Sequence, residues 1–255
     1  KPAICSVSVS DSNVPNNGII INGIKWATCN VDAPGTFAAN PESSGMFYQW
    51  NSEIGWSITD PMTSSPTGYS WDGSQGTSIP QGTIWEKVND PCPAGWRVPT
   101  RTEMESLIKM GNTRTAKNGV NGFQLGSGNN VIFLPVTGSR FSFDGKLFSS
   151  EWSGNYWSST PNYNIGGAVF SLTFDEKRGV RVTGASNQKY GYCIRCVADG
   201  YVPVSSISLD KTILSLKVGT YGKLTPTVLP NNATDKAVIW TSSNSSVVTI
   251  NNNTG

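Results

Sequence analysis

The chain has 255 residues, of which only 14% are charged, and its formal net charge at pH 7 is +2. This near-neutral balance, without a cluster of Lys and Arg, excludes the basic field that attracts nucleic acid, so we expect no nucleic-acid partner. The chain contains no histidine, which excludes Ser-His-Asp and Cys-His nucleophile systems and His-ligated zinc.

Abundant Gly, Asn, Ser and Thr are typical of a loop-rich β or α+β surface protein. No apolar run approaches the ~18 residues that a bilayer span requires, so we expect no transmembrane segment. Residues 1–5 have no apolar core behind them and do not form a signal peptide. We interpret the chain as a mature fragment of an exported protein, secreted or at the cell surface, whose signal was removed or left out.

The region before residue 90 predicts one pair of strands and then a long irregular segment. Residues 18–27 predict two strands around the turn Asn22-Gly23, because Asn-Gly favours a tight hairpin. Residues 30–90 have no sustained period and carry many aromatic side chains between turns. A stretch of this kind is usually functional or held in place by its own side chains.

The strongest helix signal begins at Thr100. Its hydroxyl can accept from the amide of Glu103, whose carboxylate reaches back, and this capping box predicts a helix over residues 101–110. An apolar stripe follows that should pack onto a sheet: Met104, Leu107 and Ile108. The capping role also explains Glu103 without any catalytic function.

Apolar or alternating runs after the helix predict strands at residues 131–136, 155–160, 168–174, 179–182 and 190–198. From about residue 203 the chain changes to short, regularly spaced β runs, typical of a β-sandwich, with Trp240 as its core residue. We therefore divide the chain into domains 1–200 and 201–255. The last residues resemble a turn into a strand that does not follow, so we expect the second domain to be truncated.

The cysteines favour disulfides over a metal site, because the chain is interpreted as exported. They are Cys5, Cys29, Cys92, Cys193 and Cys196. Cys193 and Cys196 are the one close pair, but residues i and i+3 of a strand point to opposite faces, which makes a local bridge or a shared metal geometrically poor. We expect no metal and no cofactor.

Three motifs occur in order: Cys92–Thr100 (CPAGWRVPT) with Glu103, Tyr156–Thr160 (YWSST), and Tyr192–Val197 (YCIRCV). Through them, residues 19–199 resemble the Fibrobacter succinogenes major paralogous domain, a module common in exported proteins of Bacteroidetes and their relatives. Similarity to that family implies the C-type lectin-like fold, also seen in formylglycine-generating enzymes. The resemblance implies an α+β C-type lectin-like domain with long loops, few helices and a disulfide-tied antiparallel sheet.

A second resemblance covers the end of the chain. The runs that carry it are residues 207–209, 216–219, 229–234 and 238–244. Through these, residues 204–255 resemble the group 2 bacterial Ig-like domain, which often forms stalk units in surface adhesins. The resemblance implies a partial all-β Ig-like sandwich.

The lectin-like resemblance also implies disulfide pairings. That fold joins the start of its first helix region to its last strand, which here implies a bridge from Cys92 to Cys196. Closing a loop of about 100 residues would stabilise the domain by about 4–5 kcal/mol. Pairing of the first and last strands implies a second bridge from Cys29 to Cys193, with Cys5–Cys29 as the alternative.

The same resemblance places ligand contacts in the loop between the second strand and the strand of Trp157. The candidates there are Arg140, Phe141, Phe143, Asp144, Trp152 and Tyr163. The alternative for each aromatic residue is a place in a core that is poor in aliphatic side chains. The Glu-Pro-Asn, Gln-Pro-Asp and Trp-Asn-Asp motifs of calcium-dependent lectins do not occur, so any sugar binding should be independent of Ca²⁺.

Without a catalytic constellation, the sequence favours a non-catalytic, surface-exposed binding module, acting in cell adhesion by recognising a glycan or a host or matrix protein. One alternative is a purely structural stalk or pilus-like component. The other is an oxidase related to formylglycine-generating enzymes. Such an enzyme needs a reactive cysteine pair that binds copper, for which Cys193 and Cys196 are the candidates.

Overall fold

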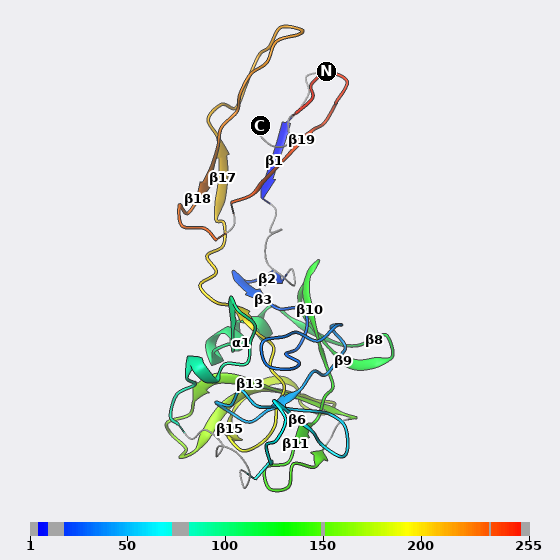
Figure 1. Cartoon of the computed structure of the whole chain (residues 1–255). Helices are drawn as coiled ribbons and strands as arrows, with labels where there is room; N and C mark the ends of the chain where they lie inside the picture. The colour runs from blue at the N-terminus through cyan, green and yellow to red at the C-terminus, as the bar shows by residue number, and fades with distance from the viewer. Residues whose placement is uncertain (1–4, 10–17, 73–81, 149–150, 235, 251–255) are drawn as a thin grey trace. The chain divides into compact units, whose positions relative to one another are not determined.

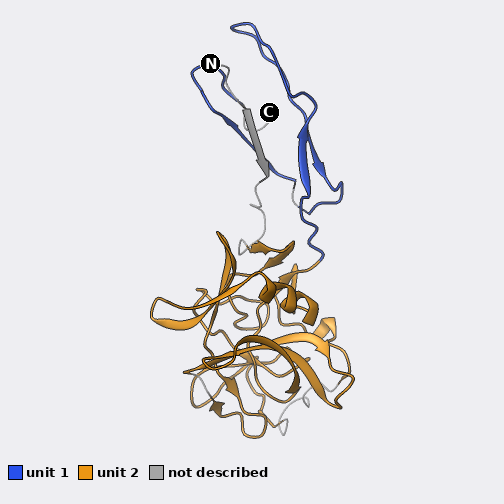
Figure 2. Cartoon of the chain, turned by 180° about the vertical axis from the view of Figure 1, so that it is seen from behind, with its two compact units in different colours: residues 1–17, 200–255 blue, residues 18–199 orange. Residues whose placement is uncertain are grey.

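The computed structural model describes residues 5–9, 18–72, 82–148, 151–234 and 236–250. The chain divides into two compact units, coloured separately in Figure 2. Residues 18–199 form the main unit, and residues 1–17 with 200–255 form the tail unit. Residues 5–9, placed in the first domain on sequence grounds, pair with a strand of the tail unit.

The main unit consists of small antiparallel sheets (Figure 1). One sheet has the strand order β2 (Ile19–Ile21), β3 (Ile24–Trp26), β16 (Val197–Ala198) and β7 (Trp96–Arg97). Three further sheets are β4 (Phe47–Tyr48), β5 (Gly55–Trp56) and β6 (Ser64–Ser65); β8 (Asn112–Lys117), β9 (Val120–Ser127) and β10 (Asn130–Pro135); and β13 (Ser153–Pro161), β14 (Ala168–Asp175) and β15 (Gly179–Asn187). The last sheet pairs β11 (Ser139–Arg140) with β12 (Leu147–Phe148).

The predicted helix is confirmed as α1 (Arg101–Lys109), which ends one residue earlier than expected. Its capping box is complete, since the amide of Glu103 donates to Thr100 Oγ1 at 3.3 Å and the amide of Thr100 donates to Glu103 Oε2 at 2.8 Å. Arg97 donates to the same carboxylate from Nη1 and Nη2, at 2.9 and 2.6 Å. The buried face of α1, with Met104 and Leu107, packs against β9, β13, β14 and β15.

The expectation of an α+β C-type lectin-like fold is wrong. In the described part of the chain, helical structure is limited to α1 and the 3₁₀ turn η1 (Lys87–Asn89), and the strands are spread over several small sheets. Residues 190–198, expected as one closing strand, join a sheet only at β16. The reason is that this run pairs with different segments one residue at a time: Gly191 with Arg140, Tyr192 with Tyr48, and Cys193 with Tyr156.

Two Asn-Gly turns shape hairpins in the main unit. The predicted pair around Asn22-Gly23 is confirmed as β2 and β3, with φ of 50° and 76° at the turn. A second hairpin, β8–β9, turns at Asn118-Gly119 with φ of 48° and 81°, which suits the left-handed region that Asn and Gly tolerate. The sequence analysis missed this hairpin because β8 is polar and largely exposed, so it carries no apolar alternation.

Large aromatic side chains fill the core of the main unit. A place in the core was the alternative to ligand binding for the aromatic residues. Trp26, Trp50, Trp96 and Trp157 are at most 2% exposed. The indole N–H of Trp157 donates to the carbonyl of Tyr48 at 2.6 Å, and that of Trp50 donates to the carbonyl of Ser158 at 2.8 Å. These bonds satisfy buried donors and connect segments more than a hundred residues apart.

One disulfide crosses the main unit. It joins Cys92 to Cys196, the pair that the resemblance implied, with the Cα atoms 6.2 Å apart. Cys29 and Cys193, expected as the second pair, are instead both buried free thiols. The side chain of Cys5, the alternative partner of Cys29, lies outside the residues whose side chains the structure describes.

The described residues of the tail unit form two pairs of antiparallel strands. β17 (Ser206–Leu209) pairs with β18 (Pro226–Leu229), and β1 (Cys5–Val9) pairs with β19 (Val238–Ser242). Trp240, the expected core residue, is 6% exposed. None of the described helices is long and apolar enough to span a membrane.

Buried acids of the main unit make its stability fall at high pH. Burial raises the pKa of the Cys193 thiol from 9.0 to about 12, and the pKa of the Tyr192 phenol from 10.0 to about 12. From about pH 9 upward the unfolded chain therefore binds fewer protons than the folded chain, so the free energy of unfolding decreases as the pH rises. The thiol alone contributes a loss of about 4 kcal/mol.

We therefore expect urea unfolding in a pH series to give a constant free energy up to about pH 8.5 and a steady decrease above it. In Cys193→Ala the decrease should begin about one pH unit later, where tyrosine takes over. If the free energy of unfolding of Cys193→Ala still began to fall at the ordinary pKa of a thiol, the loss could not be assigned to Cys193.

Candidate functional site

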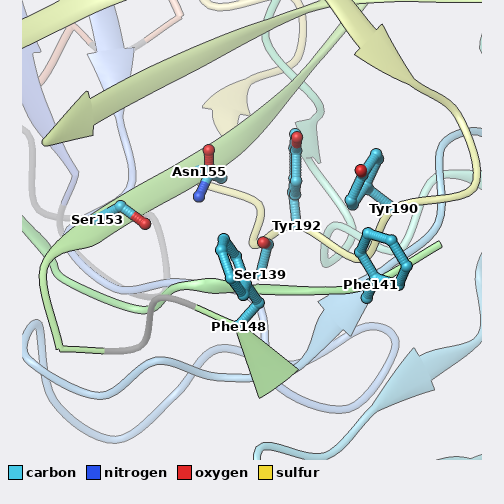
Figure 3. Close-up of a pocket in the computed structure, with 7 residues that line it drawn as sticks. All are labelled: Ser139, Phe141, Phe148, Ser153, Asn155, Tyr190 and Tyr192. Carbon is cyan, nitrogen blue, oxygen red and sulfur yellow. The ribbon is translucent and has the colours of Figure 1, made fainter. Parts of the chain in front are cut away.

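A pocket of about 290 Å³ opens on the main unit beside the β11–β12 hairpin. Its lining combines four aromatic rings with three short polar side chains: Ser139, Phe141, Phe148, Ser153, Asn155, Tyr190 and Tyr192 (Figure 3). In this view Phe141 and Tyr190 stand together on one side, Ser153 and Asn155 on the other, and the remaining three lie between them. No charged residue is among the seven.

A single backbone pairing positions the aromatic side of the pocket. The amide of Arg140 donates to the carbonyl of Gly191 at 2.9 Å, and the amide of Gly191 donates back at 3.0 Å. Because side chains alternate along extended chains, the neighbours of this pair turn to the opposite face. One such neighbouring pair is Phe141 and Tyr190, whose rings meet edge to face at 5.7 Å.

The floor of the pocket continues the aromatic core toward the surface. Tyr192 is 8% exposed and stacks on the buried Trp157 ring at 4.1 Å on one side and on Tyr190 at 5.9 Å on the other. Ser139 lies opposite Phe148 in the β11–β12 register, and Phe148 is 62% exposed. Tyr192 and Tyr190 are therefore held by contacts with other rings, whereas Phe148 is largely exposed.

The polar side of the pocket comes from the start of β13. A parallel bridge pairs Gly138 with Gly154, and the amide of Gly138 donates to the carbonyl of Ser153 at 2.7 Å. Ser153 and Asn155 flank Gly154 and share the face that lines the pocket. The Asn155 amide is fixed because its Nδ2 donates to the carbonyl of Gly138 at 3.1 Å.

Arg140 was a candidate ligand residue, and strand alternation turns it away from the pocket. It is 2% exposed, and its guanidinium donates to three backbone carbonyls: Ser57 (2.8 Å), Thr59 (2.8 Å) and Gly145 (2.6 Å). Burial lowers the pKa of Arg140. Its role in this structure is to connect the β11–β12 hairpin to the loop that follows β5.

Of the candidates, Phe141 is the one that the structure brings into the pocket lining. Phe143, Trp152 and Tyr163 are exposed and do not line it, with 84%, 59% and 76% of their surfaces accessible. Asp144 holds the hairpin turn, since its Oδ1 accepts from the amide of Lys146 at 3.1 Å. That hydrogen bond lowers the pKa of Asp144.

The sequence analysis did not select the other residues of the lining: Ser139, Phe148, Ser153, Asn155, Tyr190 and Tyr192. One signal was available, because Tyr190 and Tyr192 are two residues apart in an extended run and must share a face. Tyr192 was instead noted only as part of a family motif. The contact of this run with Arg140 has no counterpart in the local sequence.

The lining offers groups for stacking and hydrogen bonding. Its groups are aromatic faces, two hydroxyls of Ser, the phenols and one carboxamide, without a carboxylate or an amine. Burial raises the pKa of Tyr192 to about 12, so this phenol stays neutral at physiological pH. Among the described residues no group of three or more His, Cys, Asp and Glu could hold a metal ion.

Comparison with known proteins relates parts of the chain to two kinds of protein. Residues 203–255 match the family described as bacterial Ig-like domain (group 2), which confirms the expected Ig-like part. Over 102 residues the chain is 33% identical to a kappa-carrageenase of Pseudoalteromonas carrageenovora. That alignment covers 40% of this chain and 25% of the enzyme, so the chain spans about a quarter of that relative. No solved structure matches the chain at a significant level.

Proposed function

We propose that this chain is a non-catalytic binding module of a secreted or cell-surface protein, and that the main unit recognises carbohydrate at the aromatic pocket without Ca²⁺. The observation that carries the proposal is the lining itself, in which aromatic rings and fixed polar groups converge without a charged residue. Sites for small ligands are typically apolar concavities in which a few placed polar groups set the orientation.

The relatives support the same proposal from a different direction. A bacterial Ig-like domain of the matched family could serve as a spacer that holds a recognition unit on an exported protein. The name kappa-carrageenase denotes an enzyme that acts on a polysaccharide, kappa-carrageenan, which makes carbohydrate the first ligand class to test. We also propose that residues 19–199 belong to the family of the Fibrobacter succinogenes major paralogous domain. This proposal concerns the family alone and does not include the lectin-like fold.

The oxidase alternative has little support in the cysteine arrangement. Copper binding of the required kind needs two close free thiols, but Cys196 is bonded to Cys92 and Cys193 is fully buried. The stalk alternative keeps one observation in its favour, the Ig-like match at residues 203–255. It predicts that the main unit binds neither a glycan nor a matrix protein.

A glycan array that includes kappa-carrageenan and other neutral and anionic polysaccharides tests the proposal. We expect at least one glycan to bind, and Tyr190→Ala to weaken that binding at least tenfold. Truncating an aromatic hot-spot residue costs about 2 kcal/mol or more, and about 1.4 kcal/mol corresponds to a factor of ten. Dissociation constants from calorimetry measure the change.

Tyr163→Ala is the matched control, because Tyr163 is an exposed tyrosine outside the lining. It should leave the dissociation constant unchanged. Silence on every glycan would favour the stalk role, and equal losses in both variants would place the binding site elsewhere.

A further inference from the structure

We infer that the pocket accepts one uncharged sugar ring by its apolar face and rejects the same ring when it carries a sulfate or a carboxylate. The inference rests on the proposed function and specifies its ligand class. Three properties of the pocket carry it: the charge of its surroundings, the direction of its hydrogen-bonding groups, and its size.

The first property is the absence of a cation from the lining. Recognition of a sulfate or carboxylate typically uses Arg or Lys, whose donors compensate the loss of water around the anion. None of the seven lining residues is positively charged. The adjacent Arg140 is turned inward, and its guanidinium donates to the carbonyls of Ser57, Thr59 and Gly145. The lining residues themselves therefore offer an anion no ionic partner that would compensate its lost hydration.

The second property is the acceptor that the pocket presents. Since the Nδ2 of Asn155 donates to Gly138, its Oδ1 remains as an acceptor, without a partner among the described residues. A sugar hydroxyl can donate to this oxygen, whereas a sulfate or carboxylate has only acceptor oxygens and would be repelled by it. Ser139 is 6% exposed, and its hydroxyl can both donate and accept.

The third property is shape. A volume of about 290 Å³ lies just below the usual range for small-molecule sites, about 300–1,000 Å³, which suits one ring better than a chain of several. Phe141 and Tyr190 supply aromatic surface on one side, Ser153 and Asn155 lie on the opposite side, and Phe148 lies between them (Figure 3). A pyranose matches this division, because it has a face of C–H groups and an edge of hydroxyls.

The test compares matched pairs of ligands on the whole chain by NMR titration. The probes are the methyl glycosides of glucose, galactose and mannose, each beside its 6-sulfate, together with methyl glucuronide. We expect at least one neutral glycoside to bind, and its sulfate to bind at least tenfold more weakly. Raising NaCl from 50 to 500 mM should leave the neutral affinity unchanged, since no ion pair is involved.

Asn155→Ala tests the acceptor. It should weaken binding of the neutral glycoside about tenfold, while the midpoint of thermal unfolding stays within a few degrees of the wild-type value. The comparison of ligands on the wild-type protein stands even if this variant fails to fold.

A sulfated or carboxylated ring that binds as tightly as its neutral partner overturns the inference, as does binding of neutral polysaccharides without binding of any neutral monosaccharide. If an anionic glycan binds and Tyr190→Ala abolishes that binding, the proposed function stands and only its ligand class is wrong. If no glycan binds at all, both are overturned.

Discussion

Replacing Cys92 and Cys196 together by Ala should lower the free energy of unfolding of the main unit by about 4–5 kcal/mol. The bridge joins residues separated by 104 positions, so it closes most of the main unit into one loop. Without it the unfolded chain regains the conformational entropy of that loop, which is the main source of stabilisation in the chain-entropy account. A loss of this size is a large fraction of the ~5–15 kcal/mol that stabilises a typical domain.

Urea unfolding followed by tryptophan fluorescence measures the effect, because the buried indoles all belong to the core of the main unit apart from Trp240. Treating the wild-type protein with dithiothreitol should reproduce the loss, and the double variant should be insensitive to the reductant. Cys29→Ala serves as a control for the removal of a buried cysteine that is not bridged. A double variant that loses less than about 1 kcal/mol would show that the bridge does not constrain the unfolded chain as proposed.

The sequence was sufficient wherever a local pattern decides the structure. The capping box of Thr100 and Glu103 predicted α1, and the Asn22-Gly23 turn predicted the β2–β3 hairpin, because both depend on backbone groups within a few residues. The Asn118-Gly119 turn carried the same information, and the hairpin there was missed only because β8 has no apolar face to bury.

The fold of the main unit and its pocket depend on pairings that no local pattern contains. The expectation of one closing strand at residues 190–198 followed from its apolar composition, but the segment is buried because many partners surround it. The pocket exists because Gly191 pairs with Arg140, about fifty residues earlier in the chain. A shift of that pairing by one residue would turn Arg140 toward the ligand and bury Phe141, so local sequence could not decide between them.

Arg195→Leu should lower the free energy of unfolding by about 3–5 kcal/mol, because it removes all the donors of a buried hydrogen-bonding centre. Arg195 is 1% exposed. Its guanidinium donates to Asn30 Oδ1 (2.9 Å) and to the backbone carbonyls of Ala27 (3.3 Å), Thr28 (2.6 Å) and Phe133 (3.0 Å). Leucine takes the guanidinium donors away from these four acceptors, and each buried group left unsatisfied costs about 1–3 kcal/mol unless water replaces the donor.

Urea unfolding of matched variants separates this network from a general effect of removing an arginine. Arg114→Leu is the control, because Arg114 is half-exposed and paired with Glu176 at the surface, where such pairs are worth less than about 1 kcal/mol. Arg195→Lys should recover only part of the loss, since an ammonium keeps the charge but cannot reproduce the planar fork of donors. If Arg195→Lys were as stable as the wild type, charge would be the requirement at this site, and the hydrogen-bond geometry would not explain why an arginine is buried there.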